Sequence, residues 1–179
     1  MVKIKNVILD LDNTLIYAEP VEDMNDEIEK KSKYFKYHDM DGYYVVFERP
    51  GVQEFLDYLF ENYNVSVWTA ATKNYALFVI KNVILNKPER HLDYIFFYYH
   101  CAVSRRIYDC DKKLDLLWEW FKLEGYNKDN TIIIDDNDDV ISSNPKNSIQ
   151  IEKFDVKNEN SEKDKEFDKI IEEIEKLRD

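Results

Sequence analysis

The 179-residue chain has few cysteines, fewer basic than acidic residues and no long apolar run. Its two cysteines, Cys101 and Cys110, are too few for a disulfide framework. They also lack the further cysteines or histidines that a zinc site needs, so we expect ordinary thiols. The net charge of −12 argues against nonspecific binding to nucleic acid or to anionic membranes, because both require a basic field. With no apolar stretch of about 18 residues and no signal peptide, we expect an intracellular protein, cytoplasmic or nuclear.

What the chain does contain is enough apolar material for a core. Hydrophobic residues make up 44% of the sequence and aromatic residues 15%. The length is typical of one domain, so the prediction is a single domain over residues 1–179, with its core at about 5–152.

Short strand patterns alternate with helical patterns along this core. Strands are predicted over residues 7–11, 43–48, 64–68, 94–99 and 131–134, and helices over 52–63, 75–85 and 114–123. Such alternation indicates βαβ units and therefore an α/β fold with a mainly parallel sheet. The segment 93–100 is interpreted as a buried strand rather than a peptide groove.

Two segments lie outside this alternation. Residues 19–36 are polar and rich in charge, and together with 43–48 they predict a small insertion closed by a hairpin or a short strand pair around Asp41-Gly42. Residues 157–179 place apolar side chains at helical spacing, which favours a helix that covers the sheet over a partner-binding tail. These side chains are Phe167, Ile170, Ile171, Ile174 and Leu177.

Polar residues fall where several predicted elements begin or end. They are Asp10 and Asp12 after the first strand, Thr69 after "NVSVW", Asp135 and Asp136 after "TIII", and the pair Lys112 and Lys113 before a helix. Ligands of open α/β sheets bind outside the carboxyl ends of the strands, so these residues are expected to converge on one edge.

Clustered carboxylates at such an edge repel one another. Two charges about 4 Å apart repel by roughly 4 kcal/mol at an effective dielectric constant of about 20, so a cation is expected among them. An all-oxygen ligand set without cysteine or histidine favours Mg²⁺, which commonly shares its coordination with a substrate phosphate.

The order of these motifs resembles the haloacid dehalogenase superfamily of aspartate-nucleophile phosphatases. "DLDNTL", "VWTAAT", the lysine of "DKKLDLLW" and the acids of "IIIDDND" match its four motifs. The sequence is more similar still to phosphatases of the carboxy-terminal-domain and NLI-interacting-factor-like branch, through "ERPGVQEFLDYL" and "VWTAATKNYA". "NTIIIDDNDDVISSNPKNSIQI" resembles the ubiquitin-like-domain proteasome phosphatases, without their ubiquitin-like domain. The resemblance spans roughly residues 5 to 152.

The resemblance implies a Rossmann-like fold and a role for each matched residue. Asp10 would be the nucleophile that forms an aspartyl-phosphate, and Asp12 the general acid and base. Asp10, the main-chain carbonyl of Asp12, and Asp136 would hold Mg²⁺, with Asp135 as a further ligand or a neighbour of the ligands. Thr69 and a lysine would bind the phosphate; Lys112 aligns better than Lys113.

Further residues are secondary candidates. Thr14 and Ala70 lie within the matched motifs, and Arg105 and Arg106 could bind a second phosphate or an acidic peptide, although exposed solubilising arginines are the simpler interpretation. The sequence departs from the family where some members carry Asn-Ser-Pro after the first acid of the last motif, which leaves the ligand set open.

The windows that carry a cap in metabolite phosphatases are short here, at residues 17–49 and 73–111. No large cap is expected, and an open site favours a phosphoserine or phosphothreonine segment of a protein. The resemblance points the same way, with the RNA polymerase II tail as the best-known target. The alternatives are a nucleic-acid end phosphatase, which the charge disfavours, and a non-catalytic binding or scaffold module on the same fold.

Overall fold

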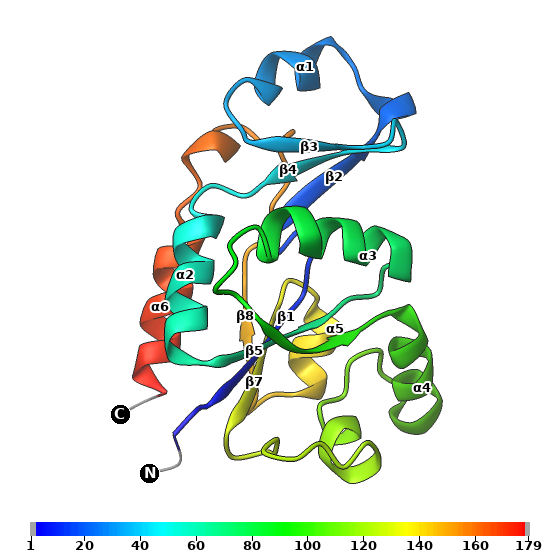
Figure 1. Ribbon diagram of the computed structural model, residues 1–179, viewed down its shortest axis with the longest axis vertical. Coiled ribbons are helices and arrows are strands. Elements are labelled where there is room, and N and C mark those ends of the chain that lie inside the picture. The colour runs from blue at the N-terminus through cyan, green and yellow to red at the C-terminus, as the bar shows by residue number, and fades with distance from the viewer. Residues whose placement is uncertain (1–2, 178–179) are drawn as a thin grey trace.

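The computed structural model describes residues 3–177, so that the first and last two residues, including the end of the predicted C-terminal helix, lie outside it (Figure 1). Its centre is a five-stranded sheet in the order β6-β5-β1-β7-β8, in which every pairing is parallel. The strands are β1 (Asn6–Leu9), β5 (Asn64–Trp68), β6 (Leu92–Phe96), β7 (Thr131–Asp135) and β8 (Ser148–Gln150). The predicted α/β fold with a parallel sheet is confirmed.

Helices cover both faces of this sheet (Figure 1). Successive residues of β1 point to opposite faces, which is why its entire apolar run is buried. Val7 and Leu9 pack in the cluster formed with α2 (Val52–Asn62), α3 (Lys73–Val79) and α6 (Glu166–Lys176). Ile8 packs on the other face, toward α4 (Tyr98–Tyr108) and α5 (Asp138–Ser143). None of the helices within residues 3–177 is long and apolar enough to cross a membrane.

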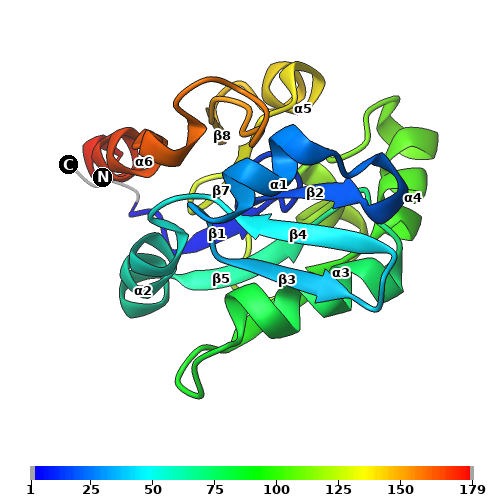
Figure 2. The ribbon, with the colours of Figure 1, turned by 90° about the horizontal axis from the view of Figure 1, so that it is seen from above.

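The insertion is a second, antiparallel sheet beyond the carboxyl end of β1 (Figures 1 and 2). Its strands are β2 (Ile16–Pro20), β3 (Tyr37–Met40) and β4 (Tyr44–Glu48), in the order β2-β4-β3, with α1 (Asp26–Ser32) between β2 and β3. The hairpin predicted at Asp41-Gly42 is confirmed: both residues have positive φ, 49° and 75°, as a tight two-residue turn requires. The insertion is larger than the predicted hairpin, since it also contains β2, α1 and β3, which the sequence did not predict.

The predicted strand over residues 94–99 is wrong at its carboxyl end. Strand β6 ends at Phe96, and α4 begins at Tyr98. The imidazole Nδ1 of His100 accepts a hydrogen bond from the main-chain N–H of Phe97 at 2.9 Å, which caps the new helix. Tyr98 and Tyr99 are consequently exposed on α4 rather than buried in the sheet. The aromatic run carries no period that separates its strand half from its helix half.

Two predicted helices are only partly regular α-helix. The helix predicted over residues 75–85 consists of α3 followed by a π-helical turn at Ile80–Ile84. The segment predicted over 114–123 contains a π-helical turn at Leu116–Trp120. Both segments still bury apolar side chains against the sheet, so the apolar pattern indicated burial correctly and helix type less well.

Residues beyond β8 return across the molecule and pack against its core. Phe167 of α6 stacks on Phe55 of α2 with ring centroids 4.4 Å apart. Leu177, at the end of the apolar stripe, is exposed. Upstream of α6, the fully buried guanidinium of Arg49 pairs with Asp164 through two 2.9 Å contacts and donates to the carbonyls of Thr14 and Glu152. Arg49 therefore joins the loop after β1 to the C-terminal segment.

Candidate active site

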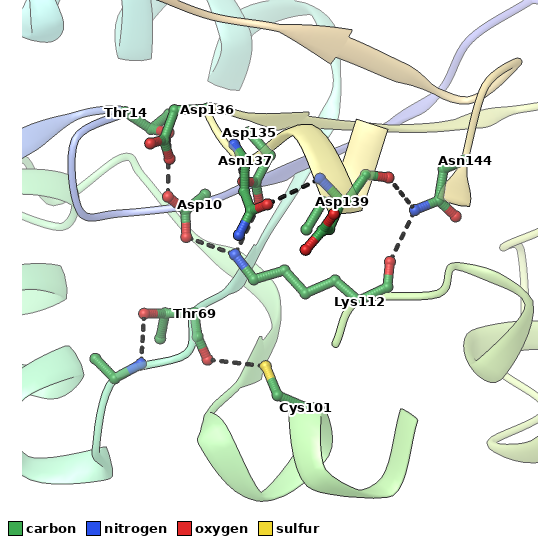
Figure 3. Close-up of polar contacts among 12 residues, drawn as sticks. Asp10, Thr14, Thr69, Cys101, Lys112, Asp135, Asp136, Asn137, Asp139 and Asn144 are labelled. Carbon is green, nitrogen blue, oxygen red and sulfur yellow. Dashed lines mark hydrogen bonds and ion pairs between the residues drawn. The ribbon is translucent and has the colours of Figure 1, made fainter. Parts of the chain in front are cut away.

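Carboxylates and a lysine converge at the carboxyl edge of the central sheet, around a hollow of about 500 Å³ (Figure 3). Asp10 directly follows β1, and its main-chain N–H donates to the carbonyl of Ile134, so the parallel ladder itself fixes its position. Asp135 is the last residue of β7, the neighbouring strand. The predicted convergence of the strand ends thus brings Asp10 and Asp135 together.

Lys112 is buried between these two carboxylates. Its Nζ lies 2.6 Å from Oδ1 of Asp10 and 2.7 Å from Oδ2 of Asp135. Although burial opposes the charged form, the two carboxylates raise the pKa of Lys112, which keeps the ammonium protonated. The site therefore holds a fixed positive charge next to Asp10.

Thr14 and Asp136 complete the ring around Asp10. The Thr14 hydroxyl donates to Oδ2 of Asp10 at 3.1 Å and lies 3.5 Å from Oδ1 of Asp136. Oxygens of Asp10, Asp135 and Asp136 all lie within 4.8 Å of one another, close enough for one metal ion. Burial, and then the charge of Asp10, raise the pKa of Asp136 and bring that of Asp135 to about 7. A divalent cation among these oxygens would favour the ionised forms and so lower these pKa values.

Asp12 lines the same hollow but is not one of the three clustered carboxylates, and its side chain has a different partner. The hydroxyl of Tyr75, on α3, donates a hydrogen bond to Oδ1 of Asp12. Burial raises the pKa of Asp12 to about 6, against the lowering effect of this hydrogen bond. Burial and the Asp12 carboxylate raise the pKa of the Tyr75 phenol far above its ordinary value, so Tyr75 remains a donor.

Thr69 and Ala70 line the opposite side of the hollow. Thr69 directly follows β5, and its side-chain oxygen accepts a hydrogen bond from the N–H of Ala71 at 3.0 Å (Figure 3). Its main-chain carbonyl accepts a bond from the buried thiol of Cys101 at 3.6 Å. The turn after β5 therefore holds Thr69 at the rim of the hollow.

Three sequence candidates point elsewhere. Lys113 donates to the carbonyl of Ser143 at 2.6 Å and pairs with Asp115, so only Lys112 of the two lysines reaches the hollow. Arg105 is exposed on α4 and pairs with Asp111, and Arg106 is exposed on the same helix. Neither arginine lines the hollow around Asp10.

Other residues of the site escaped the sequence analysis. Asn144, at the end of α5, donates to the carbonyl of Lys112 at 2.8 Å and accepts from the N–H of Leu114 at 3.0 Å, which fixes the loop that carries the lysine (Figure 3). Lys153 lines the hollow from the segment after β8. Tyr75 appeared at the start of a predicted helix and inside the matched segment "VWTAATKNYA", but with no role of its own. All three act through tertiary contacts, for which the sequence offers no spacing signal.

A parallel α/β sheet with aspartates at the ends of β1 and β7, a threonine after β5 and a lysine between the acids is a fold of the haloacid dehalogenase type. The sequence model of the NLI interacting factor-like phosphatases matches residues 5–179. The chain belongs to this family. The match extends past residue 152, where the resemblance seen in the sequence ended, and includes α6.

Individual relatives agree with this assignment. The CTD phosphatase-like protein 355R of Invertebrate iridescent virus 6 is 45% identical over 169 residues, which cover 91% of this chain and 93% of the relative. The ubiquitin-like domain-containing CTD phosphatase of Arabidopsis thaliana is 30% identical over 68% of this chain, which spans 37% of that protein. The structure of Fcp1, an RNA polymerase II CTD phosphatase of fission yeast, superposes with a TM-score of 0.54 at 21% identity, covering 98% of this chain and 50% of Fcp1. That last likeness shows a shared fold.

Proposed function

We propose that this protein is a magnesium-dependent phosphoprotein phosphatase that acts on phosphoserine or phosphothreonine through an aspartyl-phosphate at Asp10. The observation that carries the proposal is the pairing of Asp10 with the buried ammonium of Lys112 at 2.6 Å, inside a hollow that Asp12 and Thr69 also line. A structural ion pair alone has no need for further carboxylates in the same hollow, such as Asp135 and Asp136, whose charges repel that of Asp10.

The proposed reaction has two steps. A carboxylate oxygen of Asp10 attacks phosphorus, the bond from phosphorus to the seryl or threonyl oxygen breaks, and Asp12 gives its proton to that leaving oxygen. Water then attacks the aspartyl-phosphate, Asp12 takes back a proton, and inorganic phosphate leaves with Asp10 restored. The pKa of Asp12 at about 6 suits a group that must be protonated in one step and ionised in the next.

The remaining residues bind the phosphoryl group. Lys112 neutralises charge on the phosphoryl oxygens, and the hydroxyl of Thr69 donates a hydrogen bond to one of them. The three-carboxylate cluster of Asp10, Asp135 and Asp136 fits Mg²⁺, because its donors are all oxygens, and because burial together with the charge of Asp10 raises the pKa of the other two. When bound there, the ion would neutralise the cluster and polarise a phosphoryl oxygen.

The shape of the site supports a protein substrate. Within residues 3–177, none of the side chains that line the hollow comes from the insertion between β2 and β4, so this insertion does not close over the pocket. An open hollow admits a phosphorylated segment of a large molecule. The relatives named for CTD phosphatase activity support the RNA polymerase II tail, or a similar phosphopeptide, as the substrate, and hence a cytoplasmic or nuclear site of action.

Phosphate release in the presence of Mg²⁺ tests this proposal. Wild-type protein is expected to hydrolyse an aryl phosphate and a phosphoserine peptide, and Asp10→Asn is expected to lose at least about 10³-fold in kcat, since the amide cannot attack phosphorus. The matched control is Asp139→Asn, which alters an acid on α5 outside the hollow.

A parallel assay with a 3′-phosphorylated oligonucleotide separates the substrate classes. Faster release from the oligonucleotide than from the peptide would contradict the proposed substrate. Equal rates for wild type and Asp10→Asn would contradict catalysis altogether and favour a binding module.

A further inference from the structure

The side chain of Asp12 is held by a tyrosine that has no place in the reaction scheme above. The hydroxyl of the Tyr75 side chain donates a hydrogen bond to Oδ1 of the Asp12 carboxyl. Tyr75 lies on α3, directly after the turn that carries Thr69. The contact therefore joins the loop after β1 to the helix after β5.

Both partners are also anchored on the insertion sheet. The main chain of Asp12 forms a bridge with Ile16, the first residue of β2. The ring of Tyr75 meets the ring of Tyr44, the first residue of β4, edge to face with centroids 5.5 Å apart. Tyr44 is in turn paired with Pro20 at the end of β2. The small sheet thus supports the carboxyl from one side and the phenol from the other.

A carboxyl group that shuttles a proton gains from such support. Rotation about its terminal torsion is soft, so an unrestrained aspartate spreads over many orientations. A donor fixed on Oδ1 leaves Oδ2 to give or take the proton. Because Oδ1 can accept the Tyr75 bond whether or not Oδ2 carries a proton, the bond persists through both steps of the reaction.

We propose that Tyr75 is a positioning residue that orients Asp12 toward the leaving oxygen, and that Tyr44 braces Tyr75 from the insertion sheet. This inference rests on the proposed function, because it takes Asp12 to be the general acid. It assigns the insertion a task in catalysis, namely the support of the Asp12–Tyr75 pair.

The test compares leaving groups. Substrates are an alkyl phosphate monoester, whose leaving oxygen needs a proton, and a nitrophenyl phosphate, whose leaving oxygen is stable as an anion. For Tyr75→Phe, kcat/KM is expected to fall about 10- to 100-fold with the alkyl ester and by less than about threefold with the aryl ester. Tyr44→Leu is expected to produce a smaller loss with the same selectivity. Tyr43→Phe, a neighbouring exposed tyrosine on the turn before β4, is the matched control and should behave as wild type.

A double-mutant cycle shows whether Tyr75 acts through Asp12. In the Asp12→Asn background, Tyr75→Phe is expected to leave the residual kcat/KM for the alkyl ester unchanged, because the carboxyl it orients is gone. Equal losses on both esters, or an additive loss in the Asp12→Asn background, would overturn the inference and indicate a general structural role. Thermal unfolding of each variant shows whether the fold is intact.

Failure of the proposed function gives a different result. If the wild type hydrolyses both simple esters but no phosphopeptide, the substrate assignment fails while the leaving-group comparison still decides the role of Tyr75. If Tyr75→Phe and Tyr44→Leu keep the wild-type ratio of kcat/KM between the alkyl and aryl esters while the wild type hydrolyses phosphopeptides, the inference alone fails.

Discussion

At the scale of single residues, Lys112 sets the charge balance of the pocket. Its buried ammonium contacts the carboxylates of Asp10 and Asp135. A carboxylate oxygen of Asp136 lies within 4.8 Å of an oxygen of each. The cluster therefore keeps an excess of negative charge in a buried place, which costs stability until a cation joins it.

Magnesium is accordingly expected to stabilise the folded protein. At a concentration 100 times its dissociation constant, binding to the folded state alone adds about 2.7 kcal/mol to the free energy of unfolding. Asp136→Asn removes one of the three carboxylates proposed as ligands, so we expect a clearly smaller rise in Tm with added MgCl₂. Asp139→Asn serves as the control and should keep the full rise. A rise of the same size in Asp136→Asn would contradict the assignment of Asp136 as a ligand.

The sequence predicted those site residues that lie at the carboxyl ends of the central strands. Asp10, Thr69 and Asp135 stand at positions that a parallel sheet brings to one edge whatever the loops do. The choice between Lys112 and Lys113 is different, because both lie in an irregular loop whose path depends on Asn144. Tyr75 and Lys153 enter the site through packing, which no local pattern records.

At the scale of elements, the beginning of α4 depends on one imidazole. The ring of His100 lies near the rings of Phe96 and Phe121, and its Nδ1 accepts the N–H of Phe97. Burial lowers the pKa of His100 below 6.5, its ordinary value, because the charged ring is poorly solvated there. A protonated Nδ1 also could not accept this hydrogen bond.

Acid is therefore expected to weaken the fold through His100. As the pH falls below about 6.5, the unfolded chain takes up a proton at this residue more readily than the folded chain, so the free energy of unfolding decreases. His100→Gln should show a shallower decrease than wild type between pH 7.5 and 5.5, measured by urea unfolding. His91→Gln, an exposed histidine, is the control. Parallel pH dependences in wild type and His100→Gln would refute this role.

The stacked rings of α2 and α6 give a second prediction at this scale. Phe167→Ala leaves a cavity against Phe55 and is expected to lower the free energy of unfolding by about 3 to 5 kcal/mol. Leu177→Ala, at the exposed end of the same stripe, should cost less than about 1 kcal/mol. Chemical denaturation measures both. Similar losses in the two variants would show that α6 is not part of the cooperative core.

Element prediction succeeded where a single period dominates the sequence. Strand β5 has the predicted bounds, and α2 differs from its prediction by one residue. The insertion was harder, since its strands β2 and β3 are short, β3 is largely exposed, and pairing with β4 rather than local pattern makes both of them strands. The end of β6 was missed for a related reason: aromatic residues are compatible with either structure.

At the scale of the whole molecule, the net charge of −12 acts on every anionic substrate that approaches. Phosphopeptides with basic flanking residues should therefore have a higher kcat/KM than those with acidic flanks. Raising the salt concentration from 0.05 M to 0.5 M shortens the screening length and should reduce this difference. A preference that does not change with salt would have to come from contacts inside the pocket instead.

The ion pair of Arg49 with Asp164 limits where this phosphatase can be truncated or fused to another protein. The guanidinium of Arg49 is sealed in the interior, and its counter-charge, Asp164, arrives from far along the chain. A truncation between residues 152 and 164 would leave a bare cation beside the loop that follows β1, so such fragments should be insoluble or inactive. Tags and fusion partners belong after α6, downstream of Asp164, where they leave this ion pair intact.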